Sequence, residues 1–303
     1  LITFSSHLRK PIKLYDGTLV PTNAIVFALS GSGTSKDKSL NTIRKSLSQG
    51  YEQLEDYRNE YARQRAERMA LLDGARAEDW QKYYQQPKPL QAGLGTLEGL
   101  MDHFAEIGEN PMGAGSIRTS EIGSELQTNG AITDIIKIIS EAYDLGNIPA
   151  KIVKSRENQT KAVKNLPVNA LFFGSQEALL YNNDIKVKFK MVFNTQLARR
   201  SIFTFTPEQP QRVDIKSIDD LHRLREEERQ RVLKAQNALN AETSHLVENT
   251  TSEPIVLTDG ASKLFDVYME LNAILSEEMP NKFPISKLSR KHKQWLALKL
   301  AGS

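Results

Sequence analysis

The chain has 303 residues, 39% hydrophobic and 25% charged, which is enough for one large α/β domain or two smaller ones. Its net charge of +3 is too small to indicate nucleic-acid binding by itself, and the absence of cysteine excludes disulfides, thiolate metal sites and cysteine nucleophiles. No secretory signal and no apolar stretch near the ~20 residues needed to span a bilayer are visible, so we expect a cytoplasmic protein without a membrane partner.

The amino-terminal part of the chain divides into short extended pieces, one strong strand and a long helical region. Residues 1–4 and 12–14 are extended pieces that predict a lead-in hairpin or linker, and the apolar run over 24–29 predicts a buried strand. Helical periodicity then extends over 38–84, with a break near Gly74. Because charged residues crowd its second half, this region is typical of a solvated long helix or helical hairpin; a dedicated DNA-binding helix is the alternative.

Strands and helices alternate through the rest of the chain. The predicted strands lie just before the turn at 93–96, just before Glu121, over 168–173 and over 201–206, and a basic β-hairpin is predicted over 150–164. Helices are predicted over 97–107, 132–143, 215–246 and 258–279 and from Ser286 or Ser289 onward, with a mixed element over 178–194. Apolar strands separated by helices predict an α/β fold with a mostly parallel central sheet flanked by helices.

A glycine-rich stretch follows the first strand and precedes the first helix. A buried strand, a glycine turn with lysine and hydroxyl side chains, and a helix start have the layout of a phosphate-binding loop. The spacing G-x-x-x-x-G-K-[ST] does not fit, because no glycine immediately precedes Lys36 or Lys38. A plain strand–turn–helix connection is the alternative. The candidate nucleotide-binding residues are Gly31, Ser32, Gly33, Thr34, Ser35, Lys36, Asp37, Lys38 and Ser39.

Each residue type in this stretch suits a part of the phosphate chemistry. The glycines would let the backbone approach the phosphates of ATP, whose negative charge the N–H groups and the helix dipole stabilise. Lys36 is the first candidate for the β/γ-phosphate contact and Lys38 the second. A hydroxyl from Ser35 or Ser39 would reach Mg²⁺.

Catalysis would also need groups that follow neighbouring strands, because ligands of parallel sheets bind at the carboxyl ends of the strands. Glu121, with Glu125 behind it, would orient Mg²⁺ or polarise the attacking water, and Gln176 would contact the γ-phosphate or the water. The pair Arg199-Arg200 would serve as an arginine finger. The alternatives are an acidic helix start, a polar turn residue and surface charge, respectively.

The order of these features resembles the ATPase domain of phage and prophage primase–helicase proteins, a RecA-like family long labelled only as uncharacterised. The resemblance covers roughly residues 10–210. It is carried by the glycine-rich loop, Thr96-Leu97-Glu98-Gly99-Leu100, Ser120-Glu121, Ala142-Tyr143-Asp144 with the basic segment after it, Gly174-Ser175-Gln176 and Leu197-Ala198-Arg199-Arg200-Ser201-Ile202. Two departures are Thr34-Ser35, which intervene before Lys36, and Ser120, which stands where the family has aspartate.

The resemblance implies a RecA-like P-loop NTPase core over 1–210, with a helical insertion at about 45–86, and a helical extension over 211–303. The chain starts without methionine and stops just after a strongly helical pattern, so we interpret it as a region of a longer protein. The implied function is the ATP-hydrolysing motor of a replicative DNA helicase or primase–helicase, in the host cytoplasm if the protein is phage-encoded.

The same resemblance implies roles for residues and partners. ATP and Mg²⁺ would bind between subunits of a homo-oligomeric ring such as a hexamer, with Ser39 and Glu121 near the metal. Arg199 or Arg200 would reach the neighbouring subunit's nucleotide, and single-stranded DNA would pass along basic loops such as 151–164, with other replication proteins as further partners. Two alternatives stay open: a non-hydrolysing nucleotide-fold module that binds DNA or a replisome partner, which Ser120 favours, and a terminase-like packaging motor.

Overall fold

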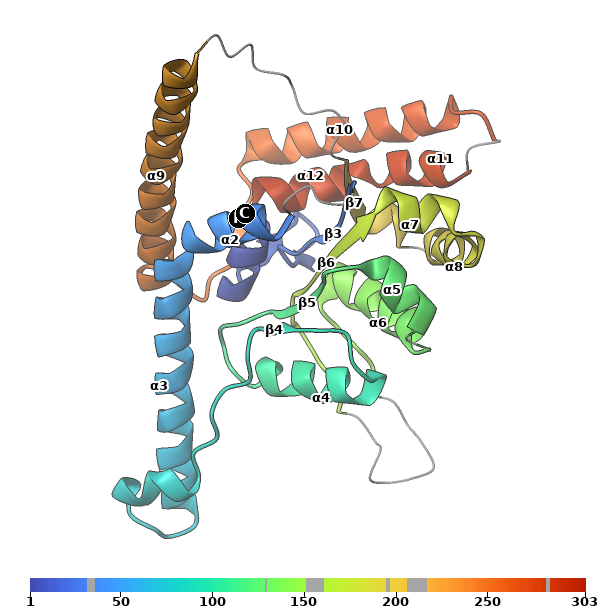
Figure 1. Ribbon diagram of the computed structural model, residues 1–303. Coiled ribbons are helices and arrows are strands. Elements are labelled where there is room, and N and C mark those ends of the chain that lie inside the picture. Colours follow the sequence, from blue (N-terminus) through green and yellow to red (C-terminus); the bar gives the residue numbers. More distant parts are fainter. Residues whose placement is uncertain (32–35, 129, 151–160, 195–196, 206–216, 282–283) are drawn as a thin grey trace.

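The computed structural model describes residues 1–31, 36–128, 130–150, 161–194, 197–205, 217–281 and 284–303, without the side chains of 36–37, 180, 192–194, 205 and 284–285. A five-stranded parallel sheet lies at its centre, in the order β4-β5-β6-β3-β7 (Figure 1). Its strands are β3 (Ile25–Ser30), β4 (Gln91–Ala92), β5 (Gly115–Thr119), β6 (Val168–Ser175) and β7 (Ser201–Phe205). The predicted α/β fold with a parallel central sheet is confirmed.

The apolar strand β3 lies between β6 and β7, so both of its hydrogen-bonding edges are covered. Ile25 is level with Ala170 of β6 and Ser201 of β7, and Ser30 is level with Ser175 at the other end of the sheet. Strands inside a parallel sheet form nearly continuous apolar runs and not alternating ones, because other elements pack on both faces of such a sheet. This explains why the run over 24–29 was readable as a strand from its sequence.

One face of the sheet holds the main core. Side chains of alternate strand positions, such as Phe27 and Phe172, pack there against four helices. These are α4 (Leu97–Gly108), α5 (Ile122–Thr128), α6 (Ile132–Leu145) and α8 (Asn183–Asn194). Helix α4 begins where the sequence predicts, because the Thr96 hydroxyl accepts a hydrogen bond from the N–H of Gly99 at 3.2 Å and caps the first turn.

The other face is covered less completely. Helix α2 (Lys36–Lys45) and the start of α3 (Ser48–Leu72) lie over it and leave a hollow of about 520 Å³ above Arg118 and Leu171. The predicted helical region thus consists of two helices, followed by a turn at Gly74 and η2 (Ala77–Lys82). The long helix α9 (Ile218–Glu248) packs on the first turns of α3, and together the two helices form the column at the side of the molecule in Figure 1.

The carboxyl-terminal helices pack on the amino-terminal hairpin. Strands β1 (Ile12–Lys13) and β2 (Leu19–Val20) form the predicted hairpin, and β8 (Ile255–Val256) adds to β1 as a parallel neighbour. Helices α10 (Asp259–Glu277), α11 (Pro284–Lys291) and α12 (Lys293–Ala301) follow. Lys299 of α12 is buried, and its ammonium donates hydrogen bonds to Asn23 and to the carbonyl of Tyr143. The region from 211 onward therefore contacts the sheet-bearing region directly.

One predicted element was wrong. Residues 1–4 are not extended but lie in α1 (Ile2–Ser5), followed by η1 (Ser6–Leu8), because a helical turn buries Phe4 edge-on to Tyr51 with ring centroids 5.2 Å apart. The mixed element is two helices, α7 (Gln176–Tyr181) and α8. Most of the predicted basic hairpin lies outside the described residues, and the antiparallel bridge between Ile148 and Val163 flanks it.

Within the described residues, no helix has the length and apolar character needed to cross a membrane.

Candidate site at the carboxyl edge of the sheet

Three segments that are distant in the sequence meet at the carboxyl edge of the sheet. Gly31 follows β3, Glu121 lies two residues beyond the end of β5, and Gln176 follows β6. Because β6 pairs with both β3 and β5, the three chain ends lie side by side in the order Glu121, Gln176, Gly31. The strand-end rule thus places together the residues that the sequence indicated.

Glu121 is fixed by backbone donors. Its Oε1 accepts hydrogen bonds from the N–H of Ser175 at 3.2 Å and from the N–H of Gly123 at 3.4 Å. The Ser175 hydroxyl in turn accepts from the N–H of Ala178 at 3.2 Å and caps α7, whose first residue is Gln176. The carboxylate therefore connects the end of β5 to the end of β6. These hydrogen bonds fix its position next to the half-buried Gln176.

The glycine-rich stretch is only partly within the described residues. Ser32, Gly33, Thr34 and Ser35 lie outside them, as do the side chains of Lys36 and Asp37. Helix α2 begins at Lys36, and Lys38 and Ser39 are exposed on its first turn. The positive end of the α2 dipole therefore lies just after the carboxyl edge of β3, where it would stabilise an anion.

Thr119 was not singled out from the sequence. It is the last residue of β5 and 5% exposed, and among the described residues its hydroxyl Oγ1 has no hydrogen-bond partner. Buried hydroxyls are normally paired, so one without a partner directly before Ser120-Glu121 marks a further candidate for ligand or water binding. The signal in the sequence was its place at the strand end.

The arginine pair lies at the opposite edge of the sheet. Arg199 and Arg200 form the end of η4 (Ala198–Arg200) and directly precede Ser201, which is level with Ile25 at the start of β3. The five-residue step along β3 from Ile25 to its end at Ser30 spans about 17 Å at the rise of a parallel strand. Neither arginine therefore reaches the glycine-rich stretch of its own chain.

Arg200 is committed to an internal ion pair. Its side chain is 7% exposed, and its guanidinium binds the carboxylate of Asp144, with Nε at 3.1 Å from Oδ1. Arg199 is more accessible and donates to Nε2 of His292 at 3.2 Å, and burial together with the two arginines lowers the pKa of this histidine. Two segments that the sequence singled out separately, around Asp144 and Arg200, are thus in contact.

The surroundings of this ion pair hold α12 on α6. The Lys299 ammonium lies 3.8 Å from the centroid of the Tyr143 ring. Burial lowers the pKa of Lys299 to about 7 and raises the pKa of the Tyr143 hydroxyl above its usual range. A cavity of about 260 Å³ lies beside the cluster, next to Trp295. Because the lysine hydrogen bonds are satisfied internally, the cluster acts as an anchor for the carboxyl-terminal helices.

The residues of the carboxyl edge fit a metal that arrives with a nucleotide. Among the described residues, no three His, Asp or Glu side chains are grouped as metal ligands. Mg²⁺ bound to phosphates keeps several waters and takes only one or two protein oxygens. Glu121 and the Ser39 hydroxyl are oxygen donors of that kind, from the segments that follow β5 and β3.

No protein-family model matches this chain, and no curated protein matches its sequence.

Proposed function

We propose that this chain is the ATP-binding and ATP-hydrolysing core of a RecA-like motor that acts on single-stranded DNA. The observation that carries the proposal is the meeting of Gly31, Glu121 and Gln176 at one sheet edge, with β6 between β3 and β5. Two strand spacings put the ends of β3 and β5 about 10 Å apart. A terminal phosphate, its metal ion and an attacking water would span that distance beyond the end of β6.

The strand order supports the same assignment. Chain order would place β4 beside β3, whereas β4 lies at the far edge and β6 returns to pair with β3. The chain therefore leaves β3 towards one edge of the sheet, where β4 lies, and leaves the neighbouring β6 towards the other edge, where β7 lies. Open parallel sheets bind ligands at such switch points. The arrangement is compatible with a RecA-like core.

The roles follow from position. Backbone N–H groups of the glycine-rich stretch and Lys36 would hold the phosphates of ATP, whose phosphoanhydride bond and Mg²⁺ supply the reactive group and its charge neutralisation. Glu121, held by the N–H groups of Ser175 and Gly123, would orient and deprotonate the attacking water. Gln176, at the start of α7, would contact the γ-phosphate.

The finger role is restricted to Arg199. Arg200 is buried and its guanidinium is ion-paired with Asp144, so reaching another chain would break this ion pair and the hydrogen bond from Nε to Oδ1. Arg199 lies at the amino edge of the sheet, so it would serve only the nucleotide of a neighbouring copy in a homo-oligomeric ring.

The test is the rate of ATP hydrolysis with and without single-stranded DNA. We expect Lys36→Ala to abolish turnover and Glu121→Gln to lower kcat by about 10²–10⁴-fold, the usual contribution of a general base, while ATP binding persists. Glu141→Gln, exposed on the second half of α6, is the matched control and should leave the rate unchanged. Unchanged turnover in Lys36→Ala would refute the lysine assignment, and Lys38→Ala would be measured next.

A second candidate is a nucleotide-fold module that binds DNA without hydrolysis. The observation that favours it is the engagement of Glu121 with two backbone N–H groups, which gives this carboxylate a structural role at the strand ends. Ser120 beside it supplies no second carboxylate. A flat ATPase rate together with retained DNA binding would select this candidate over the motor.

A further inference from the structure

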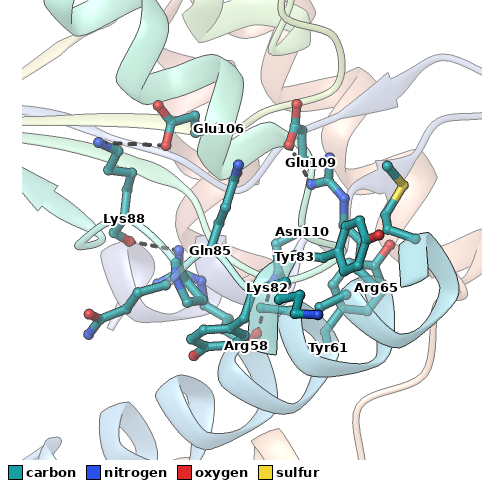
Figure 2. Close-up of a pocket in the computed structure, with 16 residues that line it drawn as sticks. Arg58, Tyr61, Arg65, Lys82, Tyr83, Gln85, Lys88, Glu106, Glu109 and Asn110 are labelled. Carbon is teal, nitrogen blue, oxygen red and sulfur yellow. Dashed lines mark hydrogen bonds and ion pairs between the residues drawn. The ribbon is translucent and has the colours of Figure 1, made fainter. Parts of the chain in front are cut away.

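A second polar hollow lies away from the carboxyl edge, between α3, the segment 82–88 and the end of α4. Its volume is about 460 Å³. Basic and tyrosine side chains point into it from α3 and from the segment that follows η2, as Figure 2 shows. We call it the tyrosine–arginine pocket and define it by Arg58, Tyr61, Arg65, Lys82, Tyr83 and Lys88.

The charges of the pocket are not balanced. Four basic and two acidic side chains line it, so four minus two leaves a net charge of +2. The carboxylates are already used: Glu109 binds Arg65, and Glu106 lies 3.7 Å from the Lys88 ammonium. Among the described residues, Lys82 has no carboxylate within ion-pair distance.

Arg58 carries the strongest electrostatic demand. It is 2% exposed, its guanidinium donates to the carbonyl of Lys88 at 2.8 Å, and among the described residues its Nε has no hydrogen-bond partner. No carboxylate among the described residues forms an ion pair with Arg58. Burial lowers its pKa, and only a longer-range attraction from Glu55 opposes this effect. A buried cation without a bound counter-charge is costly, so an anion in the pocket would stabilise it.

Tyrosine rings supply the apolar part of the pocket. Tyr61, Tyr83 and Tyr84 are half-buried, and the Tyr84 ring packs edge-on against Trp80 with centroids 5.4 Å apart. Half-buried rings beside cations are the combination on which proteins stack the bases and hold the phosphates of single strands. Neither an apolar groove nor a plain phosphate site would need both.

We propose that the tyrosine–arginine pocket binds one nucleotide of a single-stranded nucleic acid, with its phosphate against Arg58 and Lys82 and its base against the tyrosine rings. The volume of about 460 Å³ lies within the usual range of about 300–1,000 Å³ for small-molecule pockets, so the pocket admits one nucleotide. The choice of a single-stranded nucleic acid over a free nucleotide as the ligand rests on the proposed function. The nucleotide chemistry is common to both.

The test is the affinity for a short fluorescein-labelled oligothymidylate, measured by fluorescence anisotropy without ATP. Removal of one stacking ring, Tyr61→Ala, should weaken binding by about 5- to 150-fold. Lys82→Gln should reduce the slope of log affinity against log salt by about one. The matched controls are Tyr181→Ala and Lys234→Gln, whose side chains are exposed on α7 and α9, and both should bind as the parent does.

Equal affinities and salt slopes in all four variants would overturn the proposal. Arg58→Gln would destabilise the fold because the Arg58 side chain is buried. The test therefore uses Tyr61, which is partly exposed, and Lys82, which is exposed. Thymidine monophosphate provides the second arm. If it binds as tightly as the oligonucleotide and loses affinity in the same variants, the strand assignment is wrong.

The two proposals fail separately. DNA-independent ATP turnover of Tyr61→Ala and Lys82→Gln should equal that of the parent, because neither residue touches the carboxyl edge of the sheet. A parent chain that binds the oligonucleotide through the pocket but hydrolyses no ATP would refute the motor and leave the pocket in place. Intact ATPase activity with variant-insensitive DNA binding would do the reverse.

Discussion

Substitution of Gly146 by alanine tests how the end of α6 is joined to the start of β6. Gly146 caps α6 with φ +69°, and its carbonyl accepts a hydrogen bond from the N–H of Leu166 at 2.9 Å. An added Cβ would lie 2.7 Å from the Leu166 nitrogen and 2.8 Å from its oxygen, both backbone atoms that no rotamer change can move. The left-handed conformation costs alanine about 1–2 kcal/mol, and the displaced backbone adds about 1–3 kcal/mol.

Gly74 provides a control with the same backbone and no crowding. Its φ is +75°, and an added Cβ would meet nothing within 4 Å. Gly74→Ala therefore carries only the conformational cost, and the free energy of unfolding of Gly146→Ala should fall below that of Gly74→Ala by about 1–3 kcal/mol. Urea unfolding followed by far-ultraviolet circular dichroism, with equal m values, measures the difference. Equal losses in the two variants would refute the packing around Leu166.

Three further outcomes follow from buried charges. Burial, with Arg58 and Arg9 adding to it, lowers the pKa of His7 to about 3, so the unfolded chain binds an extra proton between that pH and about 6.5. The free energy of unfolding should therefore fall as the pH falls through this window, by at most about 1.4 kcal/mol per pH unit. Urea unfolding of the parent and of His7→Gln across these pH values isolates this slope. For Lys299, whose folded pKa is lowered to about 7, stability should rise from about pH 7 to pH 10.5, and Lys299→Met should lose that rise in urea unfolding across this range. Asp144→Ala should lower the free energy of unfolding by about 2–3 kcal/mol, less than for a fully buried pair because Asp144 is half exposed, and an unchanged thermal midpoint would contradict the ion pair with Arg200.

Local patterns were sufficient for much of the fold. The Thr96 cap and the isoleucine spacing of α6 are readable because cap chemistry and helical periodicity act within a few residues. Residues 1–4 could not be read in the same way, because the burial of Phe4 against Tyr51 of α3 decides their conformation. The pairing of β8 with β1 joins segments whose relation no local pattern records.

The candidate site divides along the same line. Glu121 and Gln176 could be brought together from the sequence, because the carboxyl ends of parallel strands meet at one edge. The same rule places Arg199 at the amino edge, since it precedes its strand. The tyrosine–arginine pocket was not foreseen. Its tyrosines and arginines were visible in the helical region, but the contribution of α4 depends on how the helices pack.

The binding of ATP itself tests the central claim most directly. Isothermal titration calorimetry of the chain with ATP and Mg²⁺ should show saturable binding, weakened about 10- to 150-fold in Lys36→Ala, the value of a charge-assisted hydrogen bond to phosphate. Lys45→Ala, at the far end of α2, is the matched control and should bind as the parent does. No saturable binding by the parent chain, or equal affinities in the two variants, would contradict a nucleotide site at the carboxyl edge of the sheet.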